Sequence, residues 1–309
     1  MMIRKANNKD IPQIIEVLKA GLGEGLIKKT EKIWRFKHLD NPFGESLVLV
    51  AEKDHKIVGV RAFMQWRWQQ NQQIWTAYRA VDTATHPDYQ RQGIFKKLTL
   101  NALEIAQNIS ESFVFNTPNE NSRPGYLKMG WKQVGKIKVS LIPVFLYLPY
   151  ALSKQNDFQN NQKHWQQLCD YHNRQLQSSA KIFTPKSPEY LTWRYVNNPM
   201  QSYEIVSGEN FFIAYYIKSH RFFNELRISE NIILPGAPVK DIRKKIIKEA
   251  FQNKCLLIST AKKELFNWKI FGNFGPILTF KPLTGNKMFI NEALSINNWY
   301  YSLGDLELF

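Results

Sequence analysis

One short segment limits the folds that this chain can adopt: QRQGIF, residues 90–95, lies where an apolar, threonine-rich stretch gives way to a helical pattern. The preceding AVDTATHPDY (80–89) is typical of a strand end, and KKLTLNALEIAQ (96–107) repeats apolar residues at helical spacing. Glycine at such a junction lets the backbone approach a ligand, and the NH groups of a first helical turn attract anions. The segment therefore predicts a pyrophosphate site, although one glycine at a helix start also occurs for steric reasons alone.

The surrounding pattern predicts a series of hairpins, a helix and a strand. DIPQIIEVLKAGL (10–22) has helical spacing with Asp10 as N-cap, and SLVLVAE and IVGVRAFMQWRW predict a hairpin, followed by a second that turns at 69–73. The strand SFVFNT (112–117) follows the helix that begins at Lys96, and a strand, helix, strand series implies a parallel pair. We expect an α+β fold with a mixed, mostly antiparallel sheet flanked by helices.

The chain is long enough for two domains, since it has 309 residues, 44% of them apolar. The polar stretch SKQNDFQNNQKH (153–164) marks a boundary, so we predict domains at 1–150 and 151–309. IWRFKHLDNP (33–42) and LTWRYVNNP (191–199) each precede a predicted hairpin. This predicts two copies of one α+β domain; a chance match of two short motifs is the alternative.

Composition narrows the class of function. The formal charge of +16 favours an anionic partner. Nucleic-acid binding would predict basic residues interleaved with exposed aromatics on one element, which the neighbourhood of Arg67 and Trp68 allows only loosely, so nucleic acid is not the expected ligand. Cys169 and Cys255 stand far apart, which argues against disulfide frameworks and metal sites. LIPVFLYLPYAL (141–152) is too short for a membrane span, and the N-terminus does not look like a secretory signal. We expect a cytoplasmic protein.

A second motif follows the predicted parallel strand. NENSRPGYLKMGW (119–131) supplies Asn119, Ser122, Tyr126, Gly130 and Trp131. Together with THPDYQRQGIF, it resembles the GCN5-related N-acetyltransferase (GNAT) superfamily. That family shows Q/R-x-x-G-x-G/A at the loop and N-x-x-[AS]-x-x-x-Y-x-x-x-G-[FW] after the next strand. Gln90 and Gly93 match, whereas Thr85 replaces the usual valine and Phe95 stands where glycine or alanine is common.

The resemblance implies acetyl-CoA as co-substrate, two acyl-CoA N-acyltransferase-like domains and a role for each matched residue. Pantetheine would bind along the strand end at Thr83, Ala84 and Thr85. The pyrophosphate would be held by Gln90, Arg91, Gln92, Gly93, Ile94 and Phe95. Asn119 would contact the cofactor arm, and Tyr126 would return a proton to the departing thiolate, a role that suits a phenol with an unperturbed pKa of about 10. The structural alternative for Tyr126 is a packed aromatic.

The general base is not evident from the sequence. Asp82 is the nearest candidate on the strand that would carry the thioester, although strand alternation could equally turn it away from the cleft. His86 lies in a loop and is expected to be solvated. In some tandem relatives the C-terminal carboxylate reaches the active site, and the ending permits Phe309 to do so.

The aromatic residues before the loop have two interpretations. Phe63, Trp66, Trp68, Trp75 and Tyr78 either line an acceptor pocket for a ring-bearing substrate such as a sugar, or form ordinary core. The core is the expected place for most of them.

The second half keeps the predicted pattern of elements without the motifs. ILPGAPVK precedes its helix at 239–251, and KKELFNWKIFGNF, after the strand CLLIST, lacks the asparagine and tyrosine of the first copy. We therefore expect a degenerate copy that binds no CoA.

The sequence as a whole predicts an acetyl-CoA-dependent N-acetyltransferase that acts on the amine of a small molecule or an amino sugar, by direct attack on the thioester. An aminoacyl-tRNA-dependent transferase of the peptidoglycan-bridge type is an alternative enzyme, and a CoA- or polyanion-binding module without turnover is another. The acceptor and the oligomeric state stay open.

Overall fold

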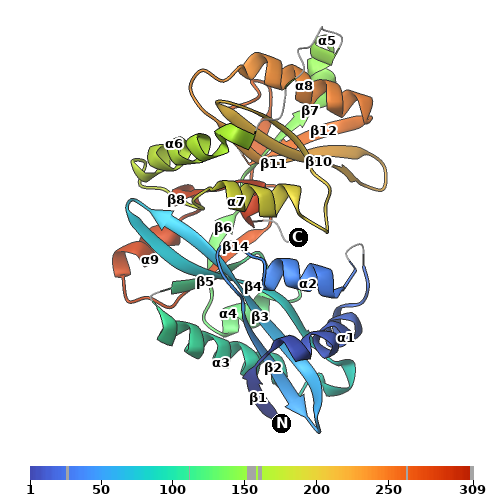
Figure 1. Ribbon diagram of the computed structural model, residues 1–309, viewed down its shortest axis with the longest axis vertical. Helices are drawn as coiled ribbons and strands as arrows, with labels where there is room; N and C mark the ends of the chain where they lie inside the picture. Colours follow the sequence, from blue (N-terminus) through green and yellow to red (C-terminus); the bar gives the residue numbers. More distant parts are fainter. Residues whose placement is uncertain (26–27, 111, 152–157, 159–161, 262–263, 307–309) are drawn as a thin grey trace. The chain divides into compact units, whose positions relative to one another are not determined.

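The computed structural model describes residues 1–309 except 26–27, 111, 152–157, 159–161, 262–263 and 307–309 (Figure 1). Among the described residues, contacts divide the chain into two units. Unit 1 holds residues 1–135 and 277–296, and unit 2 holds residues 136–276 and 297–306. The chain thus leaves unit 1, forms most of unit 2, returns to unit 1 for residues 277–296, and then enters unit 2 again.

Unit 1 is built on a mixed sheet whose strands lie in the order β1-β2-β3-β4-β5-β14-β6. The strands are β1 (Met2–Lys5), β2 (Leu47–Lys53), β3 (Lys56–Gln70), β4 (Gln73–Thr85), β5 (Ser112–Asn116), β6 (Lys132–Lys136) and β14 (Ile277–Pro282). Neighbours from β1 to β4 are antiparallel, β4 and β5 are parallel, and β5 and β14 are antiparallel. The predicted mixed, mostly antiparallel sheet is confirmed.

The helices of unit 1 cover its sheet. They are α1 (Ile11–Leu22), α2 (Glu31–His38), α3 (Ile94–Ile109), α4 (Arg123–Lys128) and α9 (Lys287–Ala293). α3 buries Leu98, Ala102 and Ala106 in a core that also contains Phe63 and Val114 of the sheet. Because these apolar residues recur every three or four positions, one face of α3 packs on the strands while the other faces solvent.

Both predicted hairpins form, with turns that follow from local sequence. Asp54 and His55 have φ of 50° and 60° and join β2 to β3, while Asn71, with φ of 52°, joins β3 to β4. Asparagine and aspartate tolerate this left-handed region better than most residues. The long β3–β4 pairing then carries the chain to the junction at residues 85–95.

Strands β4 and β5 separate before β4 ends. Their parallel pairing runs from Thr76 with Ser112 to Arg79 with Phe115, whereas β4 continues to Thr85. Within this continuation, the register against β3 shifts so that Asp82 is an extra residue, with φ of 41°. Such a β-bulge bends its strand and re-aims side chains. The separation leaves one edge of residues 80–85 without a strand partner in the described sheet.

Unit 2 contains a second mixed sheet in the order β13-β7-β12-β11-β10-β9. Its strands are β7 (Val139–Pro143), β9 (Glu204–Gly208), β10 (Phe211–Ser219), β11 (Asn224–Ile233), β12 (Cys255–Thr260) and β13 (Ile270–Gly272). Outside this six-stranded sheet, β8 (Ile182–Phe183) pairs with β15 (Trp299–Tyr300) in parallel. Its helices are α5 (Leu148–Ala151), α6 (Trp165–Gln177), α7 (Pro188–Leu191), α8 (Val239–Gln252) and α10 (Leu303–Leu306).

The two units repeat one order of elements. In unit 1 the series is β3, β4, α3, then β5 parallel to β4; in unit 2 it is β10, β11, α8, then β12 parallel to β11. β11 also carries a register shift, which leaves Ser229 as its extra residue just after the parallel pairing ends at Ile228. This agreement is what a duplicated domain predicts.

The division differs from the single boundary expected between residues 150 and 151. β14 lies next to β5 in unit 1, although it follows most of unit 2 in the sequence. The polar stretch that suggested the boundary falls largely on residues 152–157 and 159–161, which lie outside the described residues. The assignment of separate functions to 1–150 and 151–309 stays a prediction.

Candidate functional site

The junction between β4 and α3 has the geometry of an anion site. A short turn at Pro87–Tyr89 leads into a loop in which Arg91 and Gly93 have φ of 63° and 75°. Gly93 is the N-cap of α3, and no side chain caps this terminus. The first NH groups of a helix have no intrahelical partner, so here they can bind a ligand. A Cβ atom at Gly93 would meet no heavy atom within 4 Å, which shows open space in front of the loop.

The other residues of the loop divide between solvent and core. Gln90, Arg91 and Gln92 are exposed, whereas Ile94 is buried against the sheet. Phe95, the residue that departs from the family pattern, is half-buried and packs edge-on against the ring of Tyr126 at 5.8 Å. The departure thus replaces a small residue with an aromatic contact to the predicted proton donor.

Tyr126 and Thr83 are joined by a residue that the sequence did not single out. Nη1 of Arg61, on β3, donates to the Tyr126 hydroxyl at 2.8 Å and to Oγ1 of Thr83 at 2.6 Å. Tyr126 is 5% exposed and lies within α4, and Thr83 follows the bulge of β4. One guanidinium group therefore connects the predicted proton donor to the predicted thioester strand.

Arg61 is a fully buried cation whose environment is aromatic. Its guanidinium lies 4.9 Å from the ring centroid of Phe63, 5.6 Å from that of Phe95 and 5.3 Å from that of Tyr126. Its Nε and Nη2 atoms are buried without a hydrogen-bond partner among the described residues. Ring faces attract cations, but a buried charge without a carboxylate is costly. Negative charge that develops nearby is correspondingly favoured.

Asn119 lies in the turn before α4, and Ala84 and Thr85 lie at the end of β4. Oδ1 of Asn119 accepts from the backbone NH and the hydroxyl of Ser122, each at 2.9 Å, and so fixes the turn that leads into α4. Ala84 is buried and Thr85 is half-buried on the continuation of β4. The structure thus gathers Thr83 to Thr85, the loop at residues 90–95 and Tyr126 in one unit.

Asp82, the candidate base, is tied to α2. Its carboxylate pairs with Nζ of Lys37 and lies 2.9 Å from Nε2 of His38. Burial raises the pKa of this carboxyl, but the opposing charge of Lys37 and the contacts with His38 outweigh burial and hold the pKa well below its usual range. A carboxylate held so firmly in its ionised form is a weak proton acceptor. Its assignment as general base stays a prediction.

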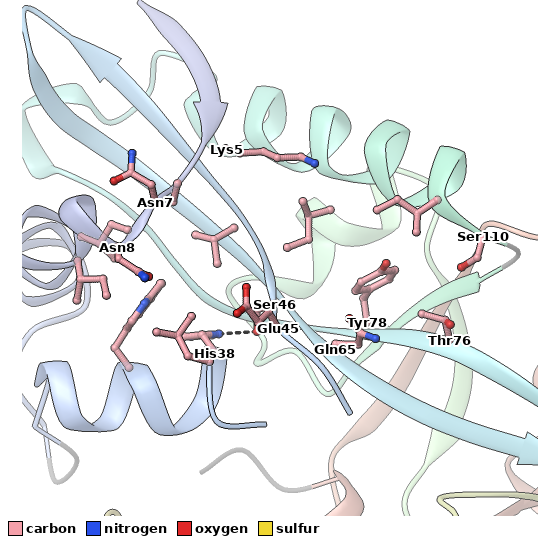
Figure 2. A pocket seen from close by; sticks show the side chains of 18 residues that line it. Lys5, Asn7, Asn8, His38, Glu45, Ser46, Gln65, Thr76, Tyr78 and Ser110 are labelled. Carbon is pink, nitrogen blue, oxygen red and sulfur yellow. Dashed lines mark hydrogen bonds between the residues drawn. The ribbon is translucent and has the colours of Figure 1, made fainter. Parts of the chain in front are cut away.

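His38 contacts Asp82 with one ring nitrogen and a pocket residue, Ser46, with the other. The imidazole is 1% exposed, and its Nδ1 atom lies 2.8 Å from Oγ of Ser46. Burial lowers the pKa of His38, which favours the neutral ring. Ser46 and His38 line a pocket of about 650 Å³. Figure 2 shows both side chains among those that line it. In the sequence His38 stands out only as part of the repeated IWRFKHLDNP motif, with no local signal of a functional role.

The pocket has a mixed lining of polar and apolar residues. Its lining includes the amides and hydroxyls of Asn7, Asn8, Ser46, Gln65, Thr76 and Ser110. Trp34 and Tyr78 add aromatic surface, and Lys5 and Glu45 contribute one charge of each sign. Such a volume is typical of a small-molecule site.

The aromatic cluster is mostly core. Four of its members are 3% exposed or less and do not line this pocket: Phe63, Trp66, Trp68 and Trp75. Tyr78 is equally buried as a whole residue yet reaches the pocket wall. The core interpretation therefore holds for four, and Tyr78 also lines this pocket.

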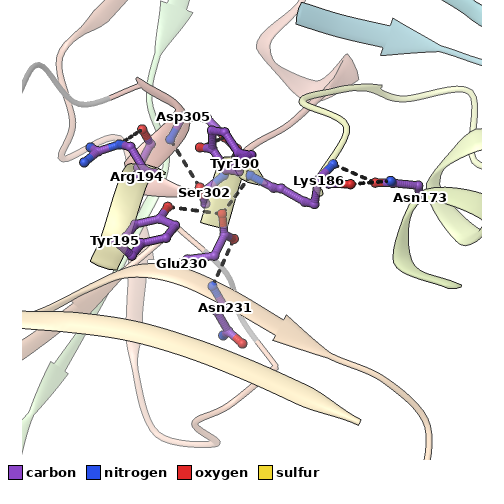
Figure 3. A network of polar contacts seen from close by, with 10 residues as sticks. Asn173, Lys186, Tyr190, Arg194, Tyr195, Glu230, Asn231, Ser302 and Asp305 are labelled. Carbon is purple, nitrogen blue, oxygen red and sulfur yellow. Dashed lines mark hydrogen bonds and ion pairs between the residues drawn. The ribbon is translucent and has the colours of Figure 1, made fainter. Parts of the chain in front are cut away.

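In unit 2, the helix α10 lies at the position that corresponds to the free edge of β4 in unit 1. α10 packs against β11, and a Cβ atom at Gly304 would lie 3.2 Å from the carbonyl oxygen of Ser229, the extra residue of β11. Lys186 fixes this segment by pairing with Asp305 and with Glu230 of β11, both at 2.7 Å (Figure 3). All three are less than 6% exposed. A buried ionic cluster thus fastens the chain's last described turn to the bulge.

Two general features complete the description. Among the described residues, no group of three His, Cys, Asp or Glu side chains is placed to hold a metal ion. None of the described helices is both long enough and apolar enough to cross a membrane. Phe309, the candidate for a C-terminal contact, lies outside the described residues.

Comparison with known proteins bears on both units. The family model described as "Acetyltransferase (GNAT) domain" matches residues 2–134. No curated protein matches the sequence significantly. Among solved structures, the fold is similar to a GCN5-related N-acetyltransferase from Anabaena variabilis, with a TM-score of 0.67 and 14% identity over 92% of this chain and 73% of that one.

Two further structures have similar folds. A probable N-acyltransferase from Enterococcus faecalis has a TM-score of 0.68 and 10% identity, over 91% of this chain and 72% of its own. A GCN5-related N-acetyltransferase from Kribbella flavida has a TM-score of 0.68 and 8% identity, over 91% and 70%. At this identity the likeness concerns the fold, and its coverage extends through both units.

Proposed function

Since residues 2–134 belong to the GNAT superfamily, we propose that unit 1 transfers an acetyl group from acetyl-CoA to the amine of a small molecule or amino sugar. Acetyl-CoA would supply the activated thioester. In the reaction the amine nitrogen bonds to the carbonyl carbon, the carbon–sulfur bond breaks, the nitrogen loses a proton, and the sulfur gains one. The residues around β4 and α3 are suited to each of these demands.

The loop and the strand end would bind the cofactor. The uncapped terminus of α3 offers NH groups and a helix dipole to the pyrophosphate, and Arg91, Lys96 and Lys97 are exposed beside it. The unpartnered edge of β4 at Thr83–Thr85 would hydrogen-bond the pantetheine amides and hold the carbonyl of the thioester. Asn119 would contact the same arm.

The link from Arg61 to both Thr83 and Tyr126 is the observation that carries this proposal. Nη1 of Arg61 donates to the oxygen of Tyr126, so the phenol's own hydrogen must point elsewhere. A proton directed away from Arg61 is available to a departing sulfur held beside Thr83. The buried charge of Arg61 also favours the negative charge that develops on that sulfur. Asp82 is kept as the candidate group for the proton lost by the amine.

Unit 2 would be a degenerate copy of the same domain. Its repeated order of elements supports a tandem origin, and α10 packs against the bulge of β11 where unit 1 offers a free strand edge. We expect one CoA site per chain. Both cysteines are buried and unpaired, as is usual in a reducing compartment, and the cytoplasm is the location we propose.

Calorimetric titration with acetyl-CoA tests the proposal. A glutamate at Gly93 would stand in the open space before the loop and repel the pyrophosphate, so Gly93→Glu should weaken binding at least about tenfold. Gly285→Glu is the matched control, because the space around Gly285 is also open and its φ is ordinary. A wild-type protein that binds no acetyl-CoA would contradict the proposal and leave aminoacyl-tRNA as the donor to test.

Binding without turnover would have a separate meaning. An amine screen with release of free thiol as readout follows the titration. If acetyl-CoA binds but no amine of any class releases thiol, the protein is a CoA-binding module, and the catalytic part of the proposal fails.

A further inference from the structure

Three side chains from separate segments form a continuous line of hydrogen bonds from β4 to the pocket. Oδ2 of Asp82 lies 2.9 Å from Nε2 of His38, and Nδ1 of His38 lies 2.8 Å from Oγ of Ser46. Asp82 is the extra residue at the bulge of β4, next to Thr83. Ser46, just before β2, is half-buried on the pocket wall. The line thus begins at the strand proposed to hold the thioester and ends at a cavity of about 650 Å³.

The direction of each hydrogen bond follows from the chemistry of the groups. Asp82 is ionised because Lys37 pairs with it, and a carboxylate only accepts. The imidazole nitrogen that faces it must therefore carry the hydrogen. A neutral ring has one such hydrogen, so Nδ1 has a lone pair and accepts from the hydroxyl of Ser46. Burial, which lowers the pKa of His38, keeps the ring neutral at pH 7.

This arrangement leaves Ser46 with oxygen lone pairs for a ligand in the pocket. A hydroxyl that donates to His38 can only accept from a ligand, and a protonated amine is a donor. When such an amine gives its proton to Ser46, the hydroxyl proton moves to Nδ1. The imidazolium that forms faces the carboxylate of Asp82, which stabilises it. The same order of hydroxyl, imidazole and carboxylate activates nucleophiles in other enzymes.

The rest of the pocket indicates the kind of amine. Asn7, Asn8, Gln65 and Thr76 offer donors and acceptors in number, whereas one lysine and one glutamate, Lys5 and Glu45, balance each other. An anionic ligand would need excess positive charge, and a purely apolar one would leave these amides unpaired. An amine that carries hydroxyl groups beside an apolar surface matches both the mixed lining and its balanced charge.

We propose that this pocket binds the acceptor as a hydroxylated amine, and that His38, acting through Ser46 and oriented by Asp82, takes the amine's proton. The inference rests on the proposed function, and it gives Asp82 a different part from that of the base itself. His38 later returns the proton to solvent through the pocket. The charged groups that face the ring or the pocket are Asp82 on β4, Lys37 on α2, and Lys5 and Glu45 on the wall.

Kinetics with glucosamine as the probe amine test the relay. Ser46→Ala should lower kcat/KM for the amine about 10- to 100-fold, a modest share of the 10²- to 10⁴-fold that acid–base catalysis contributes, without changing the Kd of acetyl-CoA. In the wild type kcat/KM should fall at acid pH as His38 becomes protonated. His38→Gln should lose this acidic limb. Ser112→Ala is the matched control, since its buried hydroxyl has no partner among the described residues, and it should leave both quantities unchanged.

A measurement without CoA separates this inference from the proposed function. In ¹⁵N spectra of the imidazole, the free protein should show His38 with its hydrogen on Nε2, and glucosamine should shift this resonance in the wild type but not in Ser46→Ala. A hydrogen on Nδ1, or a resonance that glucosamine leaves in place, would overturn the inference even if acetyl-CoA binds. Failure of acetyl-CoA binding with the glucosamine shift intact would overturn the proposed function while the pocket assignment stood.

Discussion

Nη1 of Arg61 lies 2.8 Å from the hydroxyl oxygen of Tyr126, although 65 residues separate them in the sequence. Arg61 belongs to β3 and Tyr126 to α4, so the contact exists only when α4 packs on the sheet. The same nitrogen also donates to Thr83. The phenol, the strand edge and a buried positive charge are therefore held as one group, which allows the contribution of each to be measured.

Tyr126→Phe should separate catalysis from binding. The variant keeps the ring against Phe95 and Trp131 but removes the proton, so kcat should fall about 10²-fold or more while the Kd of acetyl-CoA stays within about twofold. Steady-state assays with free-thiol detection and a titration measure the two quantities. An unchanged kcat would mean that Tyr126 is a packed aromatic and nothing more.

Arg61→Lys tests the contribution of the buried cation. Lysine keeps the charge but not the guanidinium geometry, so it cannot reach Thr83 and Tyr126 from one planar group, and kcat should fall about tenfold. Arg61→Met should cost more activity, because it removes the charge as well, and should leave the free energy of unfolding similar or higher, since an unpaired buried charge is lost. Equal activity for Lys and Met variants would argue against an electrostatic role.

Gly93→Ala should affect stability through the backbone alone. The φ of 75° lies in the left-handed region, which costs an alanine about 1 kcal/mol, and no atom stands close enough to add a clash. Denaturant unfolding measures the loss, with Gly285→Ala as a control that should show none. A loss near zero at position 93 would indicate that the loop adopts another conformation.

Acid should destabilise the protein partly through His38. The pKa of His38 is lowered in the folded state, so as pH falls below about 6.5 the unfolded chain binds a proton before the folded protein does. The contribution of neutral His38 to stability is complete above this pH and is lost as pH drops toward the pKa of the folded state. The free energy of unfolding should decrease between pH 7 and pH 5. In His38→Asn the baseline is lower, but the decrease over this range should be smaller. An identical pH slope in the two proteins would show that His38 does not titrate differently on folding.

Lys186→Met should destabilise unit 2 strongly. The change leaves two buried carboxylates, Glu230 and Asp305, without their shared cation, and loss of one partner from a buried ion pair typically costs about 3–5 kcal/mol. Lys240→Met, at an exposed position of α8, is the control and should change little. Chemical unfolding at pH 7 distinguishes them, and near-equal stability would mean that the cluster does not hold α10 in place.

Local patterns made the fold and the conformation of the loop between β4 and α3 predictable. The hairpins, the parallel pair after α3 and the left-handed glycine follow from alternation, helical spacing and one junction, all of which involve residues close in sequence. Arg61 and His38 could not be identified from local patterns. The role of each depends on hydrogen-bond partners 22 to 65 residues away in the sequence, which only the folded sheet brings close. The motif that contains His38 was visible, but only as a repeated Trp-Arg-aromatic pattern.

The order of the strands in the sheet could not be predicted from the sequence either. A position next to β5 is filled by β14, and nothing local distinguishes ILTFKP from any other short apolar strand. The expected boundary at 150 followed a shift in composition, whereas the contacts follow the return of residues 277–296 to unit 1. The likeness of β11 to β4, including the bulge, likewise appeared only once registers were known.

The return of β14 has a consequence for synthesis of the protein. A ribosome makes residues 1–135 long before Ile277–Pro282, so the newly made sheet of unit 1 has an exposed edge at β5 until these later residues have been made. Unpaired strand edges of this kind invite association with other chains. Nascent chains stalled before residue 277 should therefore bind chaperones and resist compaction, whereas those released after residue 296 should fold without delay.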